Sequence, residues 1–199
     1  MKMNYQLETD KCISSLAGQK PRLLLQSCCG PCSSYVLEYL TQFFDVTVLY
    51  YNPNIQPEAE YEMRLYYQRE VLKHIPAKLM ECDYDGAAFE VIAAGYEGAP
   101  EGGERCTRCF LLRLTETAKR AAAGGFDFFC TTLTVSPHKD AERINRIGAE
   151  LGAKYGVTWL PSDFKKRDGY LRSIQLAKEF DLYRQDWCGC SYSRQNQEH

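Results

Sequence analysis

The sequence has no run of apolar residues long enough to cross a membrane. A membrane-spanning helix needs about 20 consecutive apolar residues, and no stretch of these 199 residues approaches that length. The first twenty residues are polar and do not contain the apolar segment of a secretory signal peptide. We therefore expect a cytoplasmic protein without a membrane partner, in a compartment that keeps thiols reduced.

The sequence also lacks an excess of charge of either sign. The formal net charge is −2, which excludes a broadly basic nucleic-acid-binding surface but leaves a local patch open. The densest basic segment is Lys165-Lys166-Arg167, with Arg172 and the interleaved Tyr170 nearby. Taken alone, such charges more often form a solvated face than a binding site.

Glycine-rich phosphate-binding loops and internal repeats are absent. The first expected strand-to-helix segment reads SCCGPCSS, so cysteines stand where related α/β folds hold phosphate, and nucleotide hydrolysis is poorly supported. With 45% hydrophobic and 13% aromatic residues the chain is globular. We expect one α/β domain over residues 1–199, with an N-terminal extension at 1–19 and a C-terminal tail at 184–199.

Cysteine is abundant, and its spacing is the main functional signal. Seven of the ten cysteines form three clusters, which are Cys28, Cys29 and Cys32, then Cys106 and Cys109, then Cys188 and Cys190. Paired thiols in a reduced compartment indicate metal binding or redox catalysis rather than structural disulfides. The remaining three, Cys12, Cys82 and Cys130, stand alone and are expected to act as small buried hydrophobic residues.

Short apolar runs alternate with helical patterns along the chain. The strand candidates are Arg22–Gln26, Val46–Tyr51, Lys78–Glu81, Phe126–Thr132 and Val157–Leu160. Helical spacing joins Tyr61 to Ile75, Phe110 to Ala121 and Ile144 to Tyr155, and Ser136-Pro137 is the expected start of the third of these helices. This alternation predicts a three-layer, Rossmann-like α/β fold with a mainly parallel sheet.

Such a fold brings the cysteine clusters to one edge of the sheet. Ligands bind outside the carboxyl ends of parallel strands, and helix N-termini lie at the same edge. Cys28, Cys29 and Cys32 directly follow the first strand, and Cys106 and Cys109 begin a long helix. We expect the two clusters to meet there, lined also by residues that leave strand ends, with the Trp187–Cys190 segment folding back as a lid; those strand-end residues are 52–54, Asp83 and 131–136.

Three kinds of thiol chemistry fit these residues. The tetrad CGPC after a strand is the thioredoxin active-site pattern, but Cys28 replaces the usual tryptophan and two further α/β units follow. Two CxxC pairs would also make a structural zinc site in a non-catalytic binding module, although zinc does not need seven thiols. An iron–sulfur cluster uses three or four thiolates and leaves others for a second redox or metal element. The residues favour a reductive enzyme.

Five motifs in order carry a more specific signal. They read CCGPCSS, YYNPNIQPEAEYEMR, ERCTRCFLLRL, FFCTTLTVSPHKD and FKKRDGYLRSIQLAKEFDLYRQDWCGCSYS. Together they closely resemble the cobalamin-independent, QueH-type epoxyqueuosine reductases. The resemblance implies a HUP-type fold related to the adenine-nucleotide α-hydrolases. It also implies reduction of the epoxide of epoxyqueuosine, at the wobble position of a tRNA anticodon, to the alkene of queuosine.

The resemblance further implies a [4Fe–4S] cluster and a neighbouring single iron. Carried over residue by residue, Cys29, Cys106 and Cys109 hold the cluster, and Cys28 and Cys32 hold the iron. Some relatives have an acidic residue where this chain has Cys32. Cys188 and Cys190 match the family's terminal CGC and are expected to act as a redox pair, able to form a disulfide, or as further ligands.

The same reaction needs two protons, an external electron donor and access to a base. The candidate proton donors are His138, Tyr170 and Asp83. The modified base must leave the anticodon stack to reach the thiols, as enzymes acting on bases require. The basic segment from Lys165 to Arg172 then becomes the expected contact with tRNA phosphates and bases.

Overall fold

The structure is a computed structural model that describes residues 3–195. The outermost residues of the expected extension and tail, 1–2 and 196–199, lie outside the described part. Its centre is a five-stranded, all-parallel sheet in the order β3-β2-β1-β4-β5. The strands are β1 Arg22–Gln26, β2 Asp45–Tyr50, β3 Lys78–Glu81, β4 Phe128–Thr131 and β5 Thr158–Trp159.

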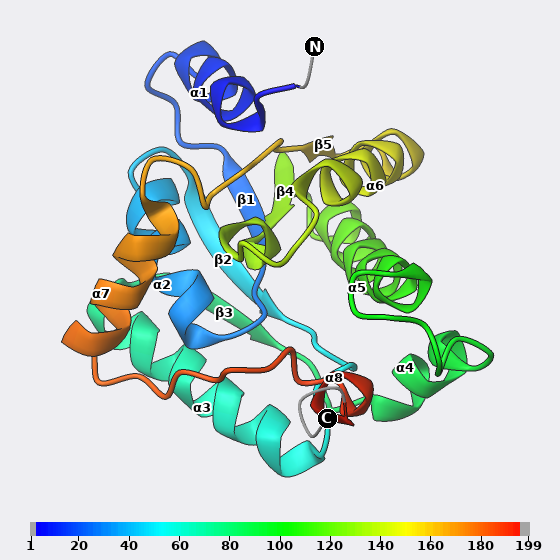
Figure 1. Cartoon of the computed structure of the whole chain (residues 1–199). Coiled ribbons are helices and arrows are strands. Elements are labelled where there is room, and N and C mark those ends of the chain that lie inside the picture. Colours follow the sequence, from blue (N-terminus) through cyan, green and yellow to red (C-terminus); the bar gives the residue numbers. More distant parts are fainter. Residues whose placement is uncertain (1–2, 196–199) are drawn as a thin grey trace.

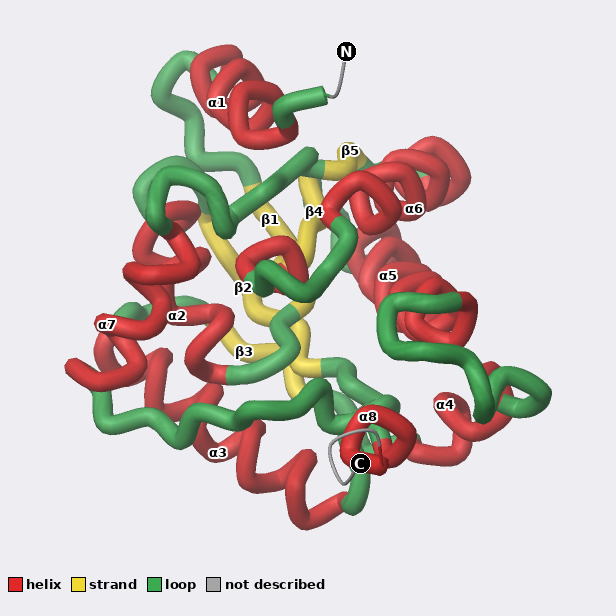
Figure 2. Tube along the Cα trace, viewed as in Figure 1, coloured by secondary structure: helices red, strands yellow, loops and turns green. Residues whose placement is uncertain are grey.

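Helices cover both faces of this sheet (Figures 1 and 2). The α-helices are α1 Tyr5–Ser15, α2 Gly30–Leu40, α3 Glu58–His74, α4 Gly86–Ala93, α5 Glu104–Ala123, α6 Ala141–Tyr155, α7 Gly169–Glu179 and α8 Ser191–Gln195; a 3-10 helix, η1, spans Thr132–Val135. Helix α2 packs with α3 and α7 in one layer, whereas α5 packs on β1, β4 and α6 in the other. The predicted three-layer α/β fold with a parallel sheet is confirmed. No described helix has the length and apolar character needed to cross a membrane.

The strands form at short, uninterrupted apolar runs of the sequence. Leu23, Leu24 and Leu25 of β1 are fully buried because helices cover both sides of the central strand. The predicted bounds of β1 and β3 are confirmed, and those of β2 and β4 agree within two residues. Strand β5 is two residues shorter than predicted, because the chain already turns into the next loop at Leu160.

Helix α6 begins later than the sequence indicates. The prediction that it starts at Ser136-Pro137 is wrong, since η1 runs into a turn in which Ser136 Oγ accepts from the backbone N–H of His138 at 3.3 Å. The helix instead begins at Ala141, where the Asp140 side chain accepts from the Arg143 N–H at 3.0 Å and caps the first turn. The segment from Ser136 to Lys139 is thereby left as a loop.

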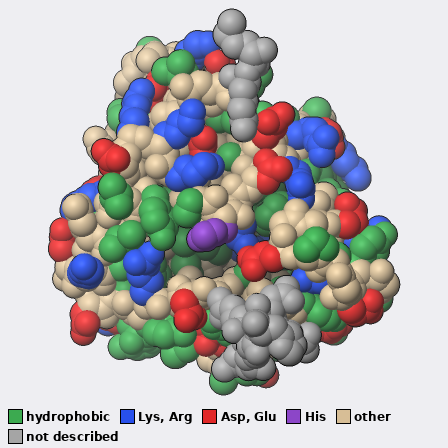
Figure 3. All heavy atoms as spheres, viewed as in Figure 1, with side chains coloured by type: hydrophobic (Ala, Val, Ile, Leu, Met, Phe, Trp, Pro, Cys, Tyr) green, Lys and Arg blue, Asp and Glu red, His purple; other side chains and the backbone are tan. Residues whose placement is uncertain are grey.

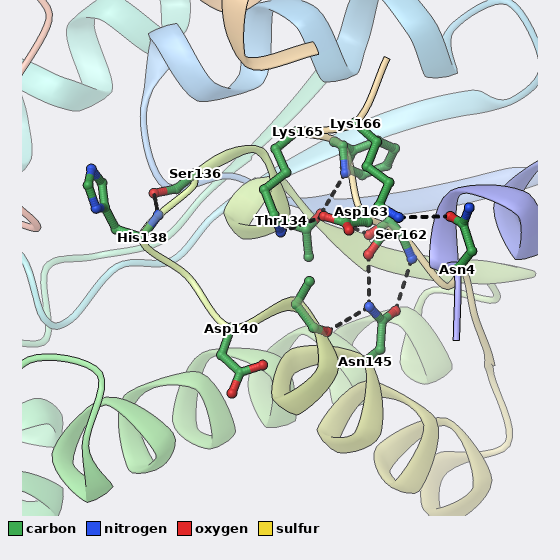
Figure 4. A network of polar contacts seen from close by, with 12 residues as sticks. Asn4, Thr134, Ser136, His138, Asp140, Asn145, Ser162, Asp163, Lys165 and Lys166 are labelled. Carbon is green, nitrogen blue, oxygen red and sulfur yellow. Dashed lines mark hydrogen bonds and ion pairs between the residues drawn. The ribbon is translucent and has the colours of Figure 1, made fainter. Parts of the chain in front are cut away.

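A buried polar network fixes the loops on that side of the sheet. Asn145 in α6 donates to the carbonyl of Ser162 at 2.8 Å and accepts from Trp159 Nε1 at 3.0 Å. Thr134 in η1 shares a 3.0 Å hydrogen bond with Ser162. Figure 4 shows that the His138 ring points away from this network. The network therefore holds the loop in place while leaving His138 to face outward.

Candidate metal centre

The strand order creates a crevice between β1 and β4. The chain leaves these neighbouring strands toward opposite faces, and such a switch point is where open parallel sheets bind ligands. The two loops meet there, because the Cys28 N–H donates to Thr132 Oγ1 at 3.2 Å and the Thr132 hydroxyl donates to Cys28 Sγ at 3.3 Å. The first cysteine cluster therefore lies at the ligand-binding position of the fold.

Three thiols converge in this loop. The sulfur atoms of Cys28, Cys29 and Cys32 all lie within 4.8 Å of one another. Cys29 is the extended N-cap of α2, and Pro31 in the first turn favours the helix start. A Cβ atom on Gly30 would lie 2.7 Å from the backbone oxygen of Tyr67, so only glycine allows this close approach to α3. The local sequence thus positions three soft ligands at a helix N-terminus, which favours anions.

The three thiols differ in pKa, and one of them ionises more readily than the other two. The pKa of Cys28 lies well below its ordinary value, because Cys29 and Cys32 hydrogen-bond to its sulfur and Arg113 adds a positive charge nearby. The same contact with Cys28 raises the pKa of Cys29 to about 12, and contacts with both neighbours raise that of Cys32. Cys28 is therefore the thiol of the three that ionises most readily, and the thiolate is the form that binds metals.

A cavity of about 770 Å³ opens in front of these thiols. Its size lies within the range of small-molecule and cofactor sites. Cys28 and Cys32 line one side, and Cys188 lines it together with Tyr170 and the exposed His138. Figure 3 shows a histidine side chain, coloured purple, beside a hollow in this face of the molecule. The structure therefore brings five candidate catalytic or metal-binding residues, Cys28, Cys32, His138, Tyr170 and Cys188, to one cavity.

The C-terminal tail folds back over this cavity, as predicted. Arg64 in α3 holds it, donating to the carbonyls of Trp187 and Cys188 at 3.3 Å each. Arg64 is itself paired with Glu60 at 2.6 Å. Gly189, with φ of +101°, makes the turn between the two tail cysteines, and its carbonyl accepts from the Gln56 N–H at 2.8 Å. The tail is therefore anchored rather than loosely attached.

The two tail cysteines face different surroundings. Cys188 lines the cavity, where Lys139 Nζ donates to its Sγ at 3.2 Å. Cys190 is buried in a small cluster with Phe89, Ala93 and Cys109. All ten cysteines are free thiols in the structure. The tail thus links the cavity to the start of α5.

Two cations, Arg113 and Lys139, lie near the second cysteine cluster. Cys106 accepts from the Gly102 N–H at 3.3 Å and, with Cys188, contributes to the electrostatic environment of Lys139. Cys109 is buried, which raises its pKa to about 12, while the nearby Arg113 lowers it. The sulfurs of Cys106 and Cys109 are not part of the compact group formed by Cys28, Cys29 and Cys32. Cys106 and Cys109 lie at the start of α5, outside this compact group.

Two cations at the cavity, Arg113 and Lys139, are not among the residues predicted from the sequence. Arg113 lies four residues after Cys109 on α5 and shares its helix face, so the spacing alone offered a signal. Lys139 follows His138 in the loop before α6. Burial lowers the pKa of Lys139, but the charge of Cys188 and the hydrogen bond to it raise the pKa above its usual value. Both cations line the cavity.

The sequence expectation for Asp83 is not met at the cavity. Asp83 is exposed beyond β3 and is not a lining residue, because β3 is the edge strand and lies two strands from the crevice. The basic segment is largely neutralised by acidic neighbours. Its ion pairs within residues 3–195 are Lys165 with Asp163 at 2.5 Å, Arg167 with Asp10, and Arg172 with Glu38 and Glu179 at 2.7 and 3.0 Å.

Comparison with known proteins identifies the family to which the chain belongs. A model of the family described as "Epoxyqueuosine reductase QueH" matches residues 23–196. The chain belongs to the QueH family of epoxyqueuosine reductases. The matched region begins in β1 and contains all three cysteine clusters, which confirms the resemblance seen in the motifs. QueH membership replaces the thioredoxin-like and zinc-module alternatives.

Curated QueH proteins match along most of their own length. The protein named epoxyqueuosine reductase QueH from Streptococcus pyogenes serotype M1 is 41% identical, over 99% of this chain and 82% of the relative. The corresponding protein of Staphylococcus epidermidis is 40% identical, over 98% and 87%. That of Thermotoga maritima is 34% identical, over 86% and 89%.

Proposed function

We propose that this QueH-family chain reduces the epoxide of epoxyqueuosine in tRNA to the alkene of queuosine. The reaction consumes two electrons and two protons and releases the epoxide oxygen as water. The observation that carries the proposal is the group of Cys28, Cys29 and Cys32 at the switch point, facing a cavity large enough for a modified base. The setting of a tRNA-modifying enzyme is the cytoplasm.

The donor set fits an iron–sulfur centre. Three convergent thiols, of which Cys28 ionises most readily, are soft ligands suited to iron. Within the proposal, Cys29, Cys106 and Cys109 hold a [4Fe–4S] cluster, and Cys28 and Cys32 hold a neighbouring single iron. When bound, these groups supply single electrons and a Lewis-acidic iron for the departing oxygen.

The cavity wall supplies the other requirements of the reaction. His138 and Tyr170 are the proton donors that the cavity supports, whereas the distance of Asp83 from the cavity speaks against that residue. Cys188 lines the cavity and Cys190 is buried beside Cys109. Within the proposal, this pair acts as a dithiol that passes electrons inward from an external donor.

The tRNA is expected to approach the cavity mouth with its wobble base turned out of the stack. Arg184 lines the mouth and donates to Tyr170 Oη at 3.0 Å, which leaves an arginine beside an aromatic ring where a base and its phosphate would enter. The neighbouring segment from Lys165 to Arg172 keeps a secondary role, since its acidic partners reduce its net charge.

The decisive test is reduction of epoxyqueuosine-containing tRNA by the anaerobically reconstituted protein with a low-potential chemical reductant. Nucleoside mass spectrometry is expected to show queuosine in place of epoxyqueuosine. An intact, reducible cluster with unchanged epoxide contradicts the proposed reaction. Single Cys→Ser variants with iron counting test the ligands: Cys29, Cys106 and Cys109 variants are expected to lose the cluster, and a Cys82 variant serves as the matched control.

A further inference from the structure

Arg113 is a buried cation without a carboxylate partner among the described residues. It projects from the middle of α5 and is only 2% exposed. The equally buried Arg64 is paired with Glu60, and Arg105 donates to three backbone carbonyls, those of Tyr96, Glu97 and Ala99. Arg113 has one oxygen acceptor, and within residues 3–195 no carboxylate forms an ion pair with it. Its Nε atom is buried without a partner.

The guanidinium is held in place by a polar network at the ends of β1 and β2. Its Nη2 atom donates to Asn52 Oδ1 at 2.6 Å. Asn52 is fixed in turn, because its amide donates to the carbonyl of Ser27 at 2.8 Å and its oxygen also accepts from Gln26 Nε2 at 3.1 Å. Thr131 in β4 donates to Gln26 Oε1 at 2.8 Å and extends the network across the crevice. Arg113 is therefore positioned by three neighbouring strands.

This position lies between two thiol clusters. Arg113 lines the cavity together with Cys28, and Cys109 precedes it by one helical turn on α5. Its charge lowers the pKa of both thiols. A buried charge left unpaired is strongly unfavourable, so a guanidinium in this position needs an anion. The thiol sulfurs on either side are the groups that can provide one.

We propose that the Arg113 guanidinium is the counter-charge of the thiolate-bound cluster that Cys109 holds, next to the iron site of Cys28, and that it sets the reduction potential of that cluster. The inference rests on the proposed iron–sulfur function and deepens it. Arg113 acts as a positioning residue, through the charge that it holds beside the ligand sulfurs. Because reduction adds a negative charge, a fixed cation beside the sulfurs favours the reduced state.

The test separates the effect of the charge of the side chain at position 113 from the effect of its shape. Arg113→Met and Arg113→Gln remove the charge, and the glutamine keeps a donor for Asn52. Arg113→Lys keeps the charge. Arg120→Met is the matched control, since Arg120 lies two turns further along α5 and is paired with Glu116 at 2.7 Å. Each protein is reconstituted anaerobically with iron and sulfide, and iron per chain and midpoint potential are measured by colorimetry and spectroelectrochemistry.

Both neutral variants are expected to lower the equilibrium constant for reduction at least tenfold, which is about 59 mV for a one-electron couple. They are also expected to retain iron 10- to 100-fold less tightly, as is typical when an outer-sphere partner of a metal site is lost. Arg113→Lys should recover most of the potential, and Arg120→Met should not change it.

Unchanged potentials in the neutral variants overturn the inference, as does an equal shift in Arg120→Met. The iron-free proteins are melted in parallel, and the neutral variants are expected to be at least as stable as the unchanged chain, since the unpaired charge is gone. If neither folds without iron, Arg113 is a structural cation and the inference fails. None of these measurements uses tRNA, so an inactive protein with an Arg113-dependent potential contradicts the proposed reaction alone. A chain that takes up no iron contradicts both.

Discussion

Lys139 Nζ lies 3.2 Å from Cys188 Sγ and donates a hydrogen bond to it. The two residues come from the loop before α6 and from the tail, and both line the cavity. Glu101 is the only carboxylate paired with Lys139 among the described residues, at the longer distance of 3.8 Å. Cys188 is therefore the closer of the two partners of a largely buried ammonium group, and the hydrogen bond that it accepts stabilises the charged form of Lys139.

Replacing Cys188 by alanine should lower the pKa of Lys139. Burial already lowers this pKa, and the charge and hydrogen bond of Cys188 are the main contributions that raise it. Without them, Lys139 should lose its proton at a lower pH and react faster with acetic anhydride at pH 9. Competitive labelling followed by mass spectrometry measures this. Cys190→Ala is the control, and identical labelling profiles for both variants would show that Cys188 does not stabilise the ammonium.

Replacing Gly189 by alanine should release the tail without unfolding the domain. The φ of +101° is strained for any residue with a Cβ, and that Cβ would lie 3.0 Å from Ile55 Cγ1 and 3.1 Å from Arg64 Nη1. The cost is about 1–3 kcal/mol, met most easily by local detachment. Cys190, 6% exposed in the intact chain, should become alkylated about tenfold faster while urea unfolding changes little. Gly98→Ala, where a Cβ meets nothing within 4 Å, is the control.

Replacing Gly30 by alanine should damage both stability and the thiol site. The added Cβ would lie 2.7 Å from a backbone oxygen of Tyr67, which cannot rotate away, so α2 must move from α3. Overpacking of this kind costs about 1–3 kcal/mol. Urea unfolding should show that loss, and iron bound per chain should fall because Cys29 and Cys32 move with α2. Full iron binding with normal stability would mean that the contact is readily relieved.

Cys130 should prove structural. It is fully buried in the apolar core on β4, and burial raises its pKa. Cys130→Ser places a hydroxyl in that core and should cost about 1–3 kcal/mol in urea unfolding if the hydroxyl finds no partner. Cys130→Ala should cost less, and both variants should bind as much iron as the unchanged chain. Loss of iron in either variant would make Cys130 part of the centre.

The sequence predicted the sheet and the position of the first cysteine cluster because both follow from local patterns. Continuous apolar runs mark buried parallel strands such as β1, and the rule that ligands bind beyond strand ends places Cys28 and Cys32 at the cavity. Asp83 was expected there too, since it also follows a strand. That expectation fails because strand order, which the local pattern does not contain, puts β3 at the edge.

Long-range side-chain contacts are the second feature that could not be predicted from the sequence. Ser136-Pro137 has the composition of a helix start, yet Asp140 caps α6, because the intervening loop is held by the network around Thr134, Ser162 and Asn145. The partners of Lys139 and Arg113 come from segments distant in the chain. Nothing in the composition of a single segment identifies such pairs.

The anchored tail has a consequence for the order in which the site is made. Cys188 is synthesised about 160 residues after Cys28, and translation adds about 5–20 residues per second. The first thiols therefore exist for about 8–30 s before the segment that covers them. During that interval they are open to iron carriers and to oxidants alike. Arrival of the tail ends the stage at which the first thiols lack this cover.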